Sequence, residues 1–125
     1  MIIGTGVDIV KNKRIADLID KYGKKFLNKI YREKEISYCS SRSQDTASFA
    51  ARYAAKEALF KALGTGMRKN SWQDIEIINN ELGKPEVNLF GKTADYAAQL
   101  EVENILLSMS HEEDYSIAQI ILEGA

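Results

Sequence analysis

The sequence predicts a domain of the α+β class, and three observations lead to that prediction. Apolar residues recur at helical spacing over most of residues 15–63, and strand-like alternation occupies residues 71–79 and 85–89. Residues 105–111 and 115–122 also alternate, and the polar segment between them predicts an antiparallel hairpin. Helices that precede and separate antiparallel strands are typical of α+β folds.

The chain of 125 residues is long enough for one hydrophobic core and too short for two, so we expect a single domain over residues 1–125. It has no repeat or flexible linker, no basic-then-apolar leader at its start, and no apolar run of membrane-spanning length. The lone Cys39 cannot form an internal disulfide, which fits a reducing compartment. We therefore expect a cytoplasmic protein that does not enter a membrane.

The elements follow in order. Residues 2–10 are rich in β-branched side chains and predict a strand, in which Gly4 and Gly6 indicate a bend or a close backbone approach. A first helix is expected to end near Gly23, and shorter helices are expected around residues 26–30 and 33–39.

The strongest helix signal covers residues 46–63, which are rich in alanine and end at Gly64, a residue type that closes helices with positive φ. Turn residues over 79–83 separate the two predicted strands 71–79 and 85–89, and residues 92–100 form an amphipathic helical pattern.

Two carboxylates are candidates for chemistry. Asp8 lies in an otherwise apolar strand, where a carboxylate is either paired and structural or placed for use. Glu57 shares one helix face with Tyr53 and Lys61, because these residues are spaced by four. An ordinary exposed Glu–Lys pair would have the same spacing, but the small neighbours Ala54 and Ala58 allow another element to approach the helix closely.

The segment Gly64-Thr65-Gly66 offers backbone amides to a phosphate, although a simple helix end explains it equally. It follows a helix C-terminus, where the helix dipole repels anions, so bound phosphate would require Lys61, a metal ion or both. His111 is the only histidine and ends a predicted strand, which excludes a zinc site built on one histidine and one distant cysteine.

Basic residues are concentrated near the start of the chain. Residues 11–34 contain nine of the 17 basic residues against three acidic ones, a local charge of +6 in a chain of net charge −1. Such a stretch is either a solvated helical surface or a docking surface for an anionic partner. Few aromatic residues for base stacking and a pI of about 5.9 argue against nucleic acid.

The order of these signals resembles one family over essentially the whole chain. Residues 4–10 (GTGVDIV) are similar to the opening motif of the holo-acyl-carrier-protein synthases, the small bacterial-type phosphopantetheinyl transferases. Residues 52–58 (RYAAKEA) and 61–66 (KALGTG) closely resemble their second motif, which is strongly specific. Residues 82–85 (LGKP) and the hairpin that begins with residues 108–111 (SMSH) are similar to later parts of the family pattern.

The resemblance implies a phosphopantetheinyl transferase-like fold, an antiparallel sheet with a long central helix, assembled as a homotrimer with active sites between subunits. It implies Mg²⁺ held by Asp8 and Glu57, which agrees with the preference of this ion for carboxylates and phosphate oxygens. It further implies transfer of 4′-phosphopantetheine from coenzyme A to a serine of apo-acyl carrier protein, in support of fatty acid biosynthesis. Glu57, or a metal-bound water that it orients, is the candidate base, and Lys61 the group that stabilises charge on the pyrophosphate.

The resemblance also assigns binding surfaces. Coenzyme A would contact Lys61, the glycine loop and, near its nucleotide end, Pro85 and His111, with Arg52 and Lys56 as possible helpers; Arg52 could equally be a structural partner of a carboxylate. Only Arg42 is basic in the loop of residues 40–45, where the family holds the 3′-phosphate with more basic residues. The acidic carrier protein would dock on the first helices. The residues expected there are Arg14, Leu18, Lys21, Lys24, Lys25 and Phe26.

One alternative remains open beside the enzyme and nucleic-acid binding. A non-catalytic protein could bind coenzyme A or a nucleotide without turnover. Asp8, Glu57 and Lys61 together argue against it, because binding alone does not require two metal carboxylates.

Overall fold

The computed structural model describes residues 1–43, 45–64 and 71–125 of the chain. Strand β1 (Ile2–Lys11) leads into helices α1 (Asn12–Tyr22), α2 (Lys24–Ile30), α3 (Glu33–Ser40) and α4 (Asp45–Leu63). The short helix η1 (Trp72–Asp74), strands β2 (Ile75–Asn79) and β3 (Pro85–Leu89) and helix α5 (Gly91–Gln99) follow. The hairpin of β4 (Asn104–His111) and β5 (Tyr115–Glu123) ends the fold, which confirms the predicted α+β class with antiparallel strands.

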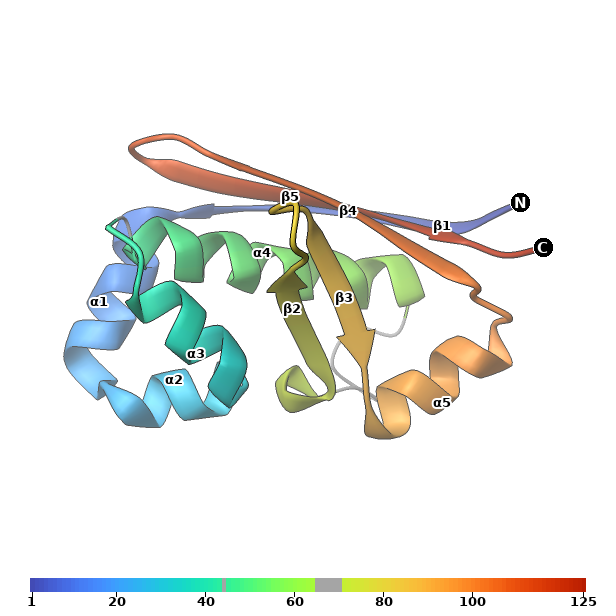
Figure 1. Ribbon diagram of the computed structural model, residues 1–125, viewed down its shortest axis with the longest axis horizontal. Coiled ribbons are helices and arrows are strands. Elements are labelled where there is room, and N and C mark those ends of the chain that lie inside the picture. Colours follow the sequence, from blue (N-terminus) through green and yellow to red (C-terminus); the bar gives the residue numbers. More distant parts are fainter. Residues whose placement is uncertain (44, 65–70) are drawn as a thin grey trace.

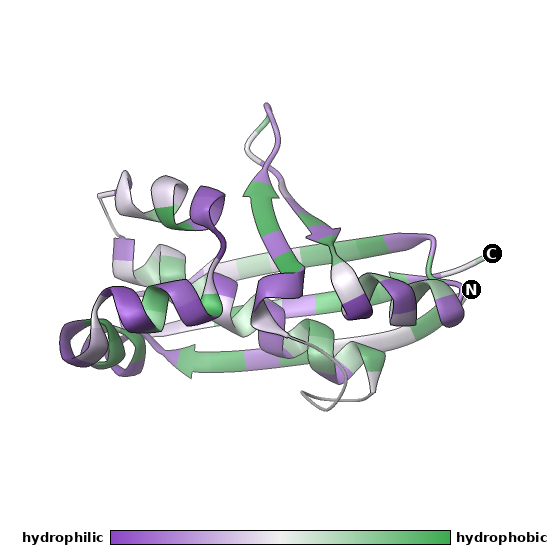
Figure 2. Cartoon of the chain, turned by 90° about the horizontal axis from the view of Figure 1, so that it is seen from below, coloured by the Kyte–Doolittle hydropathy of each residue, from purple (hydrophilic) through white to green (hydrophobic). Residues whose placement is uncertain are grey.

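The strands form two sheets. One sheet has the order β1-β5-β4, so the first and last strands of the chain lie side by side, and β2 and β3 form a second, two-stranded sheet. Helix α4 packs against β1 and β5 on one face of the larger sheet (Figure 1). Helices α1–α3 lie at one end of α4, and their bands of hydrophilic and hydrophobic residues are visible at the left of Figure 2.

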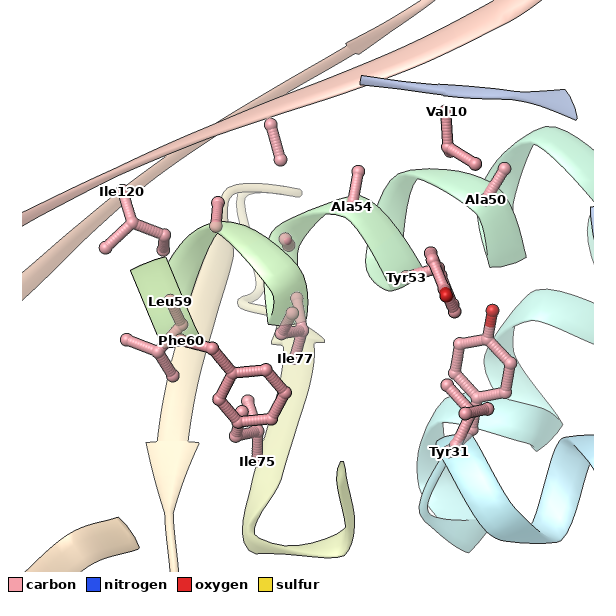
Figure 3. Close-up of a cluster of buried hydrophobic side chains, with 14 of the residues drawn as sticks. Val10, Tyr31, Ala50, Tyr53, Ala54, Leu59, Phe60, Ile75, Ile77 and Ile120 are labelled. Atoms are coloured by element: carbon pink, nitrogen blue, oxygen red, sulfur yellow. The ribbon is translucent and has the colours of Figure 1, made fainter. Parts of the chain in front are cut away.

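Helix α4 is buried on nearly all sides. Fourteen of its 19 residues are buried, as expected for a helix enclosed by other elements. Val10 of β1 points toward the alanine-rich surface near Ala50, and Ile120 of β5 packs near Leu59 (Figure 3). The core therefore forms around the segment in which the strongest family motif was found.

Two glycines allow β1 to cross α4 at very close range. A Cβ atom built on Gly6 would lie 1.9 Å from the carbonyl oxygen of Ala58, and one on Gly4 would lie 2.3 Å from that of Ala62. Any side chain at these positions would push the strand off the helix. The predicted close approach is thus present, with glycine on the strand and alanine on the helix.

The segment predicted as a strand over residues 71–79 is a strand only from Ile75. Before it, the Ser71 hydroxyl accepts a hydrogen bond from the Gln73 amide at 3.3 Å and caps the short helix η1. The Trp72 ring stacks on Tyr53 with 5.1 Å between ring centroids. This capped turn and the aromatic contact replace strand pairing at the start of the segment.

The remaining boundaries agree with the expectations to within one or two residues. Gly64 follows α4 with a φ of +82°, as predicted for the residue that closes this helix. The turn before β3 is held by the side-chain oxygen of Asn80, which accepts hydrogen bonds from the amides of Leu82 and Lys84.

Candidate active site

Strand β1 brings a carboxylate to the surface of α4. The residues of β1 that face the helix are Gly4, Gly6, Asp8 and Val10, because alternate residues of a strand point to the same side. The two glycines let the strand lie against the helix backbone, and Val10 is buried. Asp8 therefore lies at the strand–helix contact, with 18% of its side chain exposed.

Lys61 of α4 meets this carboxylate. Its ammonium nitrogen lies 3.0 Å from Asp8 Oδ1 and also donates to the backbone oxygen of Val7 at 3.0 Å. The Lys61 side chain is 54% exposed, so its charge remains accessible to a ligand. Two residues far apart in the sequence are thus brought together in the folded chain.

Glu57 lies one turn before Lys61 and is half-buried. Burial raises its pKa above the usual value, and the nearby negative charge of Asp8 raises it further. The positive charges of Lys61 and Arg14 act in the opposite direction. Asp8, Glu57, Lys61 and Arg14 therefore form one electrostatically coupled group.

Tyr53 completes the helix face that the spacing predicted. Its hydroxyl accepts a hydrogen bond from Arg14 Nη2 at 3.4 Å, and the Arg14 guanidinium lies 5.5 Å from the ring centroid. Burial raises the pKa of Tyr53, while Arg14 lowers it. Arg14 was assigned to carrier docking from sequence; the structure places it also beside Glu57, a position that no spacing between α1 and α4 could reveal.

The two carboxylates fit a magnesium ion. The raised pKa of Glu57 shows that burial and repulsion from Asp8 are not fully offset by Lys61 and Arg14, and a divalent cation would relieve both effects. Magnesium typically takes one or two carboxylates together with substrate phosphates. Within residues 1–43, 45–64 and 71–125 there is no cluster of three or more histidine, cysteine or acidic side chains suited to a metal ion, so substrate and water would supply the other ligands.

A cavity separate from the site of Asp8 and Lys61 contains the residues expected at the nucleotide end of coenzyme A. Arg52, Pro85 and His111 line a space of about 310 Å³ together with Arg42 and Tyr38. Arg52 is held there by Asn79 Oδ1 at 2.5 Å and by the Ile77 backbone oxygen at 3.3 Å.

Both arginines of this cavity lie over the Tyr38 ring. Their guanidinium carbons are 4.7 Å (Arg52) and 5.2 Å (Arg42) from its centroid. The hydrogen-bond partners of Arg52 in the described part of the chain are backbone, hydroxyl and amide oxygens, none of them charged. The sequence left open a carboxylate partner for Arg52; instead two arginines make the cavity electropositive, which suits an anionic ligand.

Lys56 does not belong to either site. Its side chain is completely buried and forms an ion pair with Glu35 at 2.7 Å, and its ammonium also donates to the Ile30 backbone oxygen at 2.7 Å. The expectation that Lys56 helps to bind the nucleotide is wrong. The sequence suggested a binding role only because Lys56 lies within the motif. Its ion-pair partner Glu35 lies on another helix, so the motif could not indicate the pair.

The basic surface lies on α1 and α2. Lys21, Lys24 and Lys25 are exposed, whereas Phe26 is only 8% exposed and packs edge-on against Tyr31 at 6.2 Å. An apolar groove of about 360 Å³ runs between these helices and α4. Its lining residues are Leu18, Tyr22, Lys25, Phe26, Lys29, Ile30, Tyr53 and Trp72. Leu18 is therefore the more accessible apolar residue, and Phe26 contributes mainly to the floor of the groove.

Of the expected glycine loop, Gly64 lies at the C-terminal end of α4, three residues after Lys61. Thr65 and Gly66 lie outside the described residues. No helix in the described part of the chain combines the length and apolar character needed to cross a membrane.

Comparison with known proteins places this chain in one class of transferase. The family model described as the 4′-phosphopantetheinyl transferase superfamily matches residues 4–120, and the chain belongs to that superfamily. Within it, the chain is 47% identical to the holo-[acyl-carrier-protein] synthase of Koribacter versatilis, over 98% of this chain and 99% of the relative. It is 46% identical to that of Solibacter usitatus, over 99% and 100% of the two chains.

Solved structures give the same result. The crystal structure of the holo-[acyl-carrier-protein] synthase from Neisseria meningitidis matches with a TM-score of 0.91 and 37% identity, over 98% of this chain and 99% of the other. The Helicobacter pylori synthase in complex with coenzyme A matches with a TM-score of 0.84 and 29% identity, over 95% and 99%. The predicted membership of the holo-acyl-carrier-protein synthase family, and with it the prediction of an enzyme, is confirmed.

Proposed function

We propose that this chain transfers 4′-phosphopantetheine from coenzyme A to a serine of an apo-acyl carrier protein in a magnesium-dependent reaction. The observation that supports it best is the convergence of Asp8, Glu57 and Lys61 where β1 crosses α4. Magnesium, held by Asp8 and Glu57, would supply a Lewis acid for the coenzyme A pyrophosphate.

In the proposed reaction the serine oxygen of the carrier protein attacks the phosphorus that bears pantetheine. The bond from this phosphorus to the leaving 3′,5′-adenosine bisphosphate breaks, and the serine hydroxyl gives up its proton. Glu57 takes that proton, directly or through a water. Lys61 stabilises the charge on the pyrophosphate and the leaving group.

Coenzyme A would reach this site from the cavity of Arg42, Arg52, Pro85 and His111, which we assign to its nucleotide end. Gly64, Thr65 and Gly66 would border the phosphate path. The Neisseria and Koribacter relatives named above are synthases of holo-acyl carrier protein, and the Helicobacter relative binds coenzyme A. We therefore assign the same donor and acceptor here, with a role in fatty acid biosynthesis in the cytoplasm.

The carrier protein would dock on α1 and α2. Arg14, Lys21, Lys24 and Lys25 present a basic rim beside the apolar groove that Leu18 lines, which suits an acidic partner. Phe26 would support this surface from below. Arg14 also lies beside Glu57, so a carrier bound here could bring its serine to the reacting phosphate.

We also propose that the single domain of residues 1–125 assembles as a homotrimer with active sites between subunits. The outer face of the β1-β5-β4 sheet supports an assembly, because Val7, Ile9, Leu106 and Ile117 are all exposed there. An apolar sheet face of this kind is typical of a contact surface.

The function is tested by mixing the protein with apo-carrier protein, coenzyme A and magnesium and then weighing the carrier. We expect the mass gain of one phosphopantetheine group and no gain when magnesium is removed with a chelator. An unchanged carrier mass with coenzyme A still bound would instead support the non-catalytic binding protein.

A further inference from the structure

Asn12 uses its side chain in an unusual way for a residue at the start of a helix. Asparagine near a helix N-terminus commonly accepts a hydrogen bond from its own helix. Here the side chain of Asn12, the first residue of α1, crosses instead to the β4–β5 hairpin, 100 residues away in the chain. Its amide nitrogen donates to the backbone oxygens of Glu112 at 2.9 Å and Glu113 at 3.1 Å.

Two further hydrogen bonds complete this junction. The backbone amide of Asn12 donates to the Asp114 backbone oxygen at 2.8 Å. The side-chain oxygen of Asn12 accepts a hydrogen bond from the Ser116 hydroxyl at 2.7 Å. Asn12 is 7% exposed and Ser116 is fully buried, so water competes little for these bonds. One residue therefore holds three consecutive carbonyl groups of the hairpin tip.

The hairpin tip carries His111 next to three acidic residues. Ser116, which bonds Asn12, is the strand partner of His111. His111 lines both the cavity that contains Arg42 and Arg52 and the adjacent cavity beside Asn12, whereas Glu112, Glu113 and Asp114 line only the adjacent one. Of these four residues of the tip, His111 alone borders the electropositive cavity, and the three acidic residues lie outside it.

This orientation matters for an anionic ligand. Rotation or drift of the tip would bring carboxylates toward the cavity and would weaken the attraction of its two arginines for phosphate. The carbonyl groups that Asn12 holds belong to the acidic residues themselves.

We propose that Asn12 is a positioning residue for coenzyme A binding: it holds the hairpin tip so that His111, and not the acidic residues after it, borders the nucleotide cavity. This proposal rests on the proposed function, because it takes coenzyme A as the ligand of that cavity. Asn12 acts through the hairpin and does not itself touch the substrate.

The test uses Asn12→Asp, which keeps the size and the acceptor for Ser116 but removes both amide donors to the tip. We expect the dissociation constant and KM for coenzyme A to rise between about twofold and tenfold, the range for losing one or two hydrogen bonds. The kcat and the KM for carrier protein should change little. Hydrogen exchange of the backbone amides of residues 112–116 should become faster, a readout that does not depend on turnover.

His111→Ala and Ser116→Ala provide the matched variants. His111→Ala should weaken coenzyme A binding, and adding Asn12→Asp to it should cause little further loss, because both changes act through one contact. Ser116→Ala keeps both amide donors of Asn12 and should have the smaller effect, and it serves as the second variant if Asn12→Asp fails to fold. Asn28→Asp, on the exposed side of α2, controls for the added charge.

The proposal is overturned if Asn12→Asp leaves coenzyme A affinity unchanged, if the Asn12 and His111 effects simply add, or if only thermal stability and kcat fall. Failure of the proposed function would look different, since the wild-type protein would then modify no carrier at all. Titration with coenzyme A and hydrogen exchange would still report on Asn12 in that case.

Discussion

Opposing electrostatic effects act on the carboxylate of Glu57. Burial and the charge of Asp8 raise its pKa, while Lys61 and Arg14 favour its ionised form. The raised pKa means that the folded protein binds this proton more tightly than the unfolded chain does. Ionisation of Glu57 therefore costs stability as pH rises from the usual glutamate pKa through the raised pKa of the folded protein.

We predict that Glu57→Gln raises the stability of the protein and lowers its activity. The neutral amide should make the magnesium-free protein more thermostable at neutral pH, because the buried negative charge beside Asp8 is removed. Phosphopantetheine transfer should fall by about 10²-fold or more, the scale seen when one group that stabilises the transition state is lost. Thermal melts at pH 4 and pH 7.5, with the carrier-mass assay, measure both effects.

Glu33→Gln serves as the control, because Glu33 is an exposed glutamate at the start of α3 and is not part of the site. Unaffected turnover in Glu57→Gln would refute the metal and base assignments. A loss of stability at neutral pH would contradict the unfavourable environment described for the ionised carboxylate.

At the scale of elements, the approach of β1 to α4 aligns the site. Gly6 lies against the carbonyl of Ala58, and Asp8 follows it on the same side of the strand. We predict that Gly6→Ala lowers the free energy of unfolding by about 2–3 kcal/mol, because the new methyl group must displace backbone atoms. Transfer activity should fall as well, since Asp8 moves with the strand.

Urea denaturation and carrier modification test this prediction together. Thr5→Ala is the matched control, one residue earlier on the exposed side of the same strand, and it should change stability by no more than about 0.5 kcal/mol. Equal stabilities of Gly6→Ala and Thr5→Ala would show that β1 can move away from α4 without cost.

Helices α1 and α2 carry the second element-scale prediction. Replacing Lys24 and Lys25 with Glu should raise the KM for an acidic carrier protein about tenfold at low salt, with a smaller effect at high salt as charges are screened. The affinity for coenzyme A should change much less. Lys92→Glu on α5, away from these helices in Figure 1, is the control for reversing a lysine charge. Equal losses for carrier and coenzyme would place the docking surface elsewhere.

Short-range sequence patterns predicted most of the helices and strands, because the spacing of apolar residues within a segment largely determines its secondary structure. Alternation predicted the β4–β5 hairpin. The glycines of β1 and the alanines of α4 each indicated a site where another element could approach closely, and the structure shows that these two elements approach each other. The helical spacing of Tyr53, Glu57 and Lys61 predicted a shared face, and their mutual influence agrees with it.

Long-range partners could not be predicted in this way. From its place in the motif, Lys56 was expected to be available for binding the nucleotide. In the structure it is buried in an ion pair with Glu35, which lies 21 residues earlier in the chain. The strand predicted over residues 71–79 starts only at Ile75, after the short helix in which Trp72 stacks on Tyr53 of α4. The hydrogen bonds from Asn12 to the hairpin tip span 100 residues or more, so no spacing rule could indicate them.

At the scale of the whole molecule, the sheet has one face on α4 and one face without a partner in the single chain. Ile9 and Ile117 are direct strand neighbours on that outer face and are 60% and 40% exposed. Val7 and Leu106 extend the apolar area, while the polar residues between them, Ser108 and Gln119, are uncharged. Burial of such a surface between copies of the chain would be favourable, since it removes apolar area without burying charge.

We predict that the wild-type protein sediments at close to three times its chain mass of 14.0 kDa. The double substitution Ile9→Glu and Ile117→Glu should give a folded monomer, because both side chains point away from the core and their ionised forms resist burial. If neighbouring subunits complete the active sites, this monomer should also lose carrier modification while keeping the circular dichroism of the wild type. Gln99→Glu at the exposed end of α5 should leave both mass and activity unchanged. A wild-type protein that sediments as a monomer and still modifies its carrier would contradict the assembly, and it would require each chain to hold coenzyme A with its own residues alone.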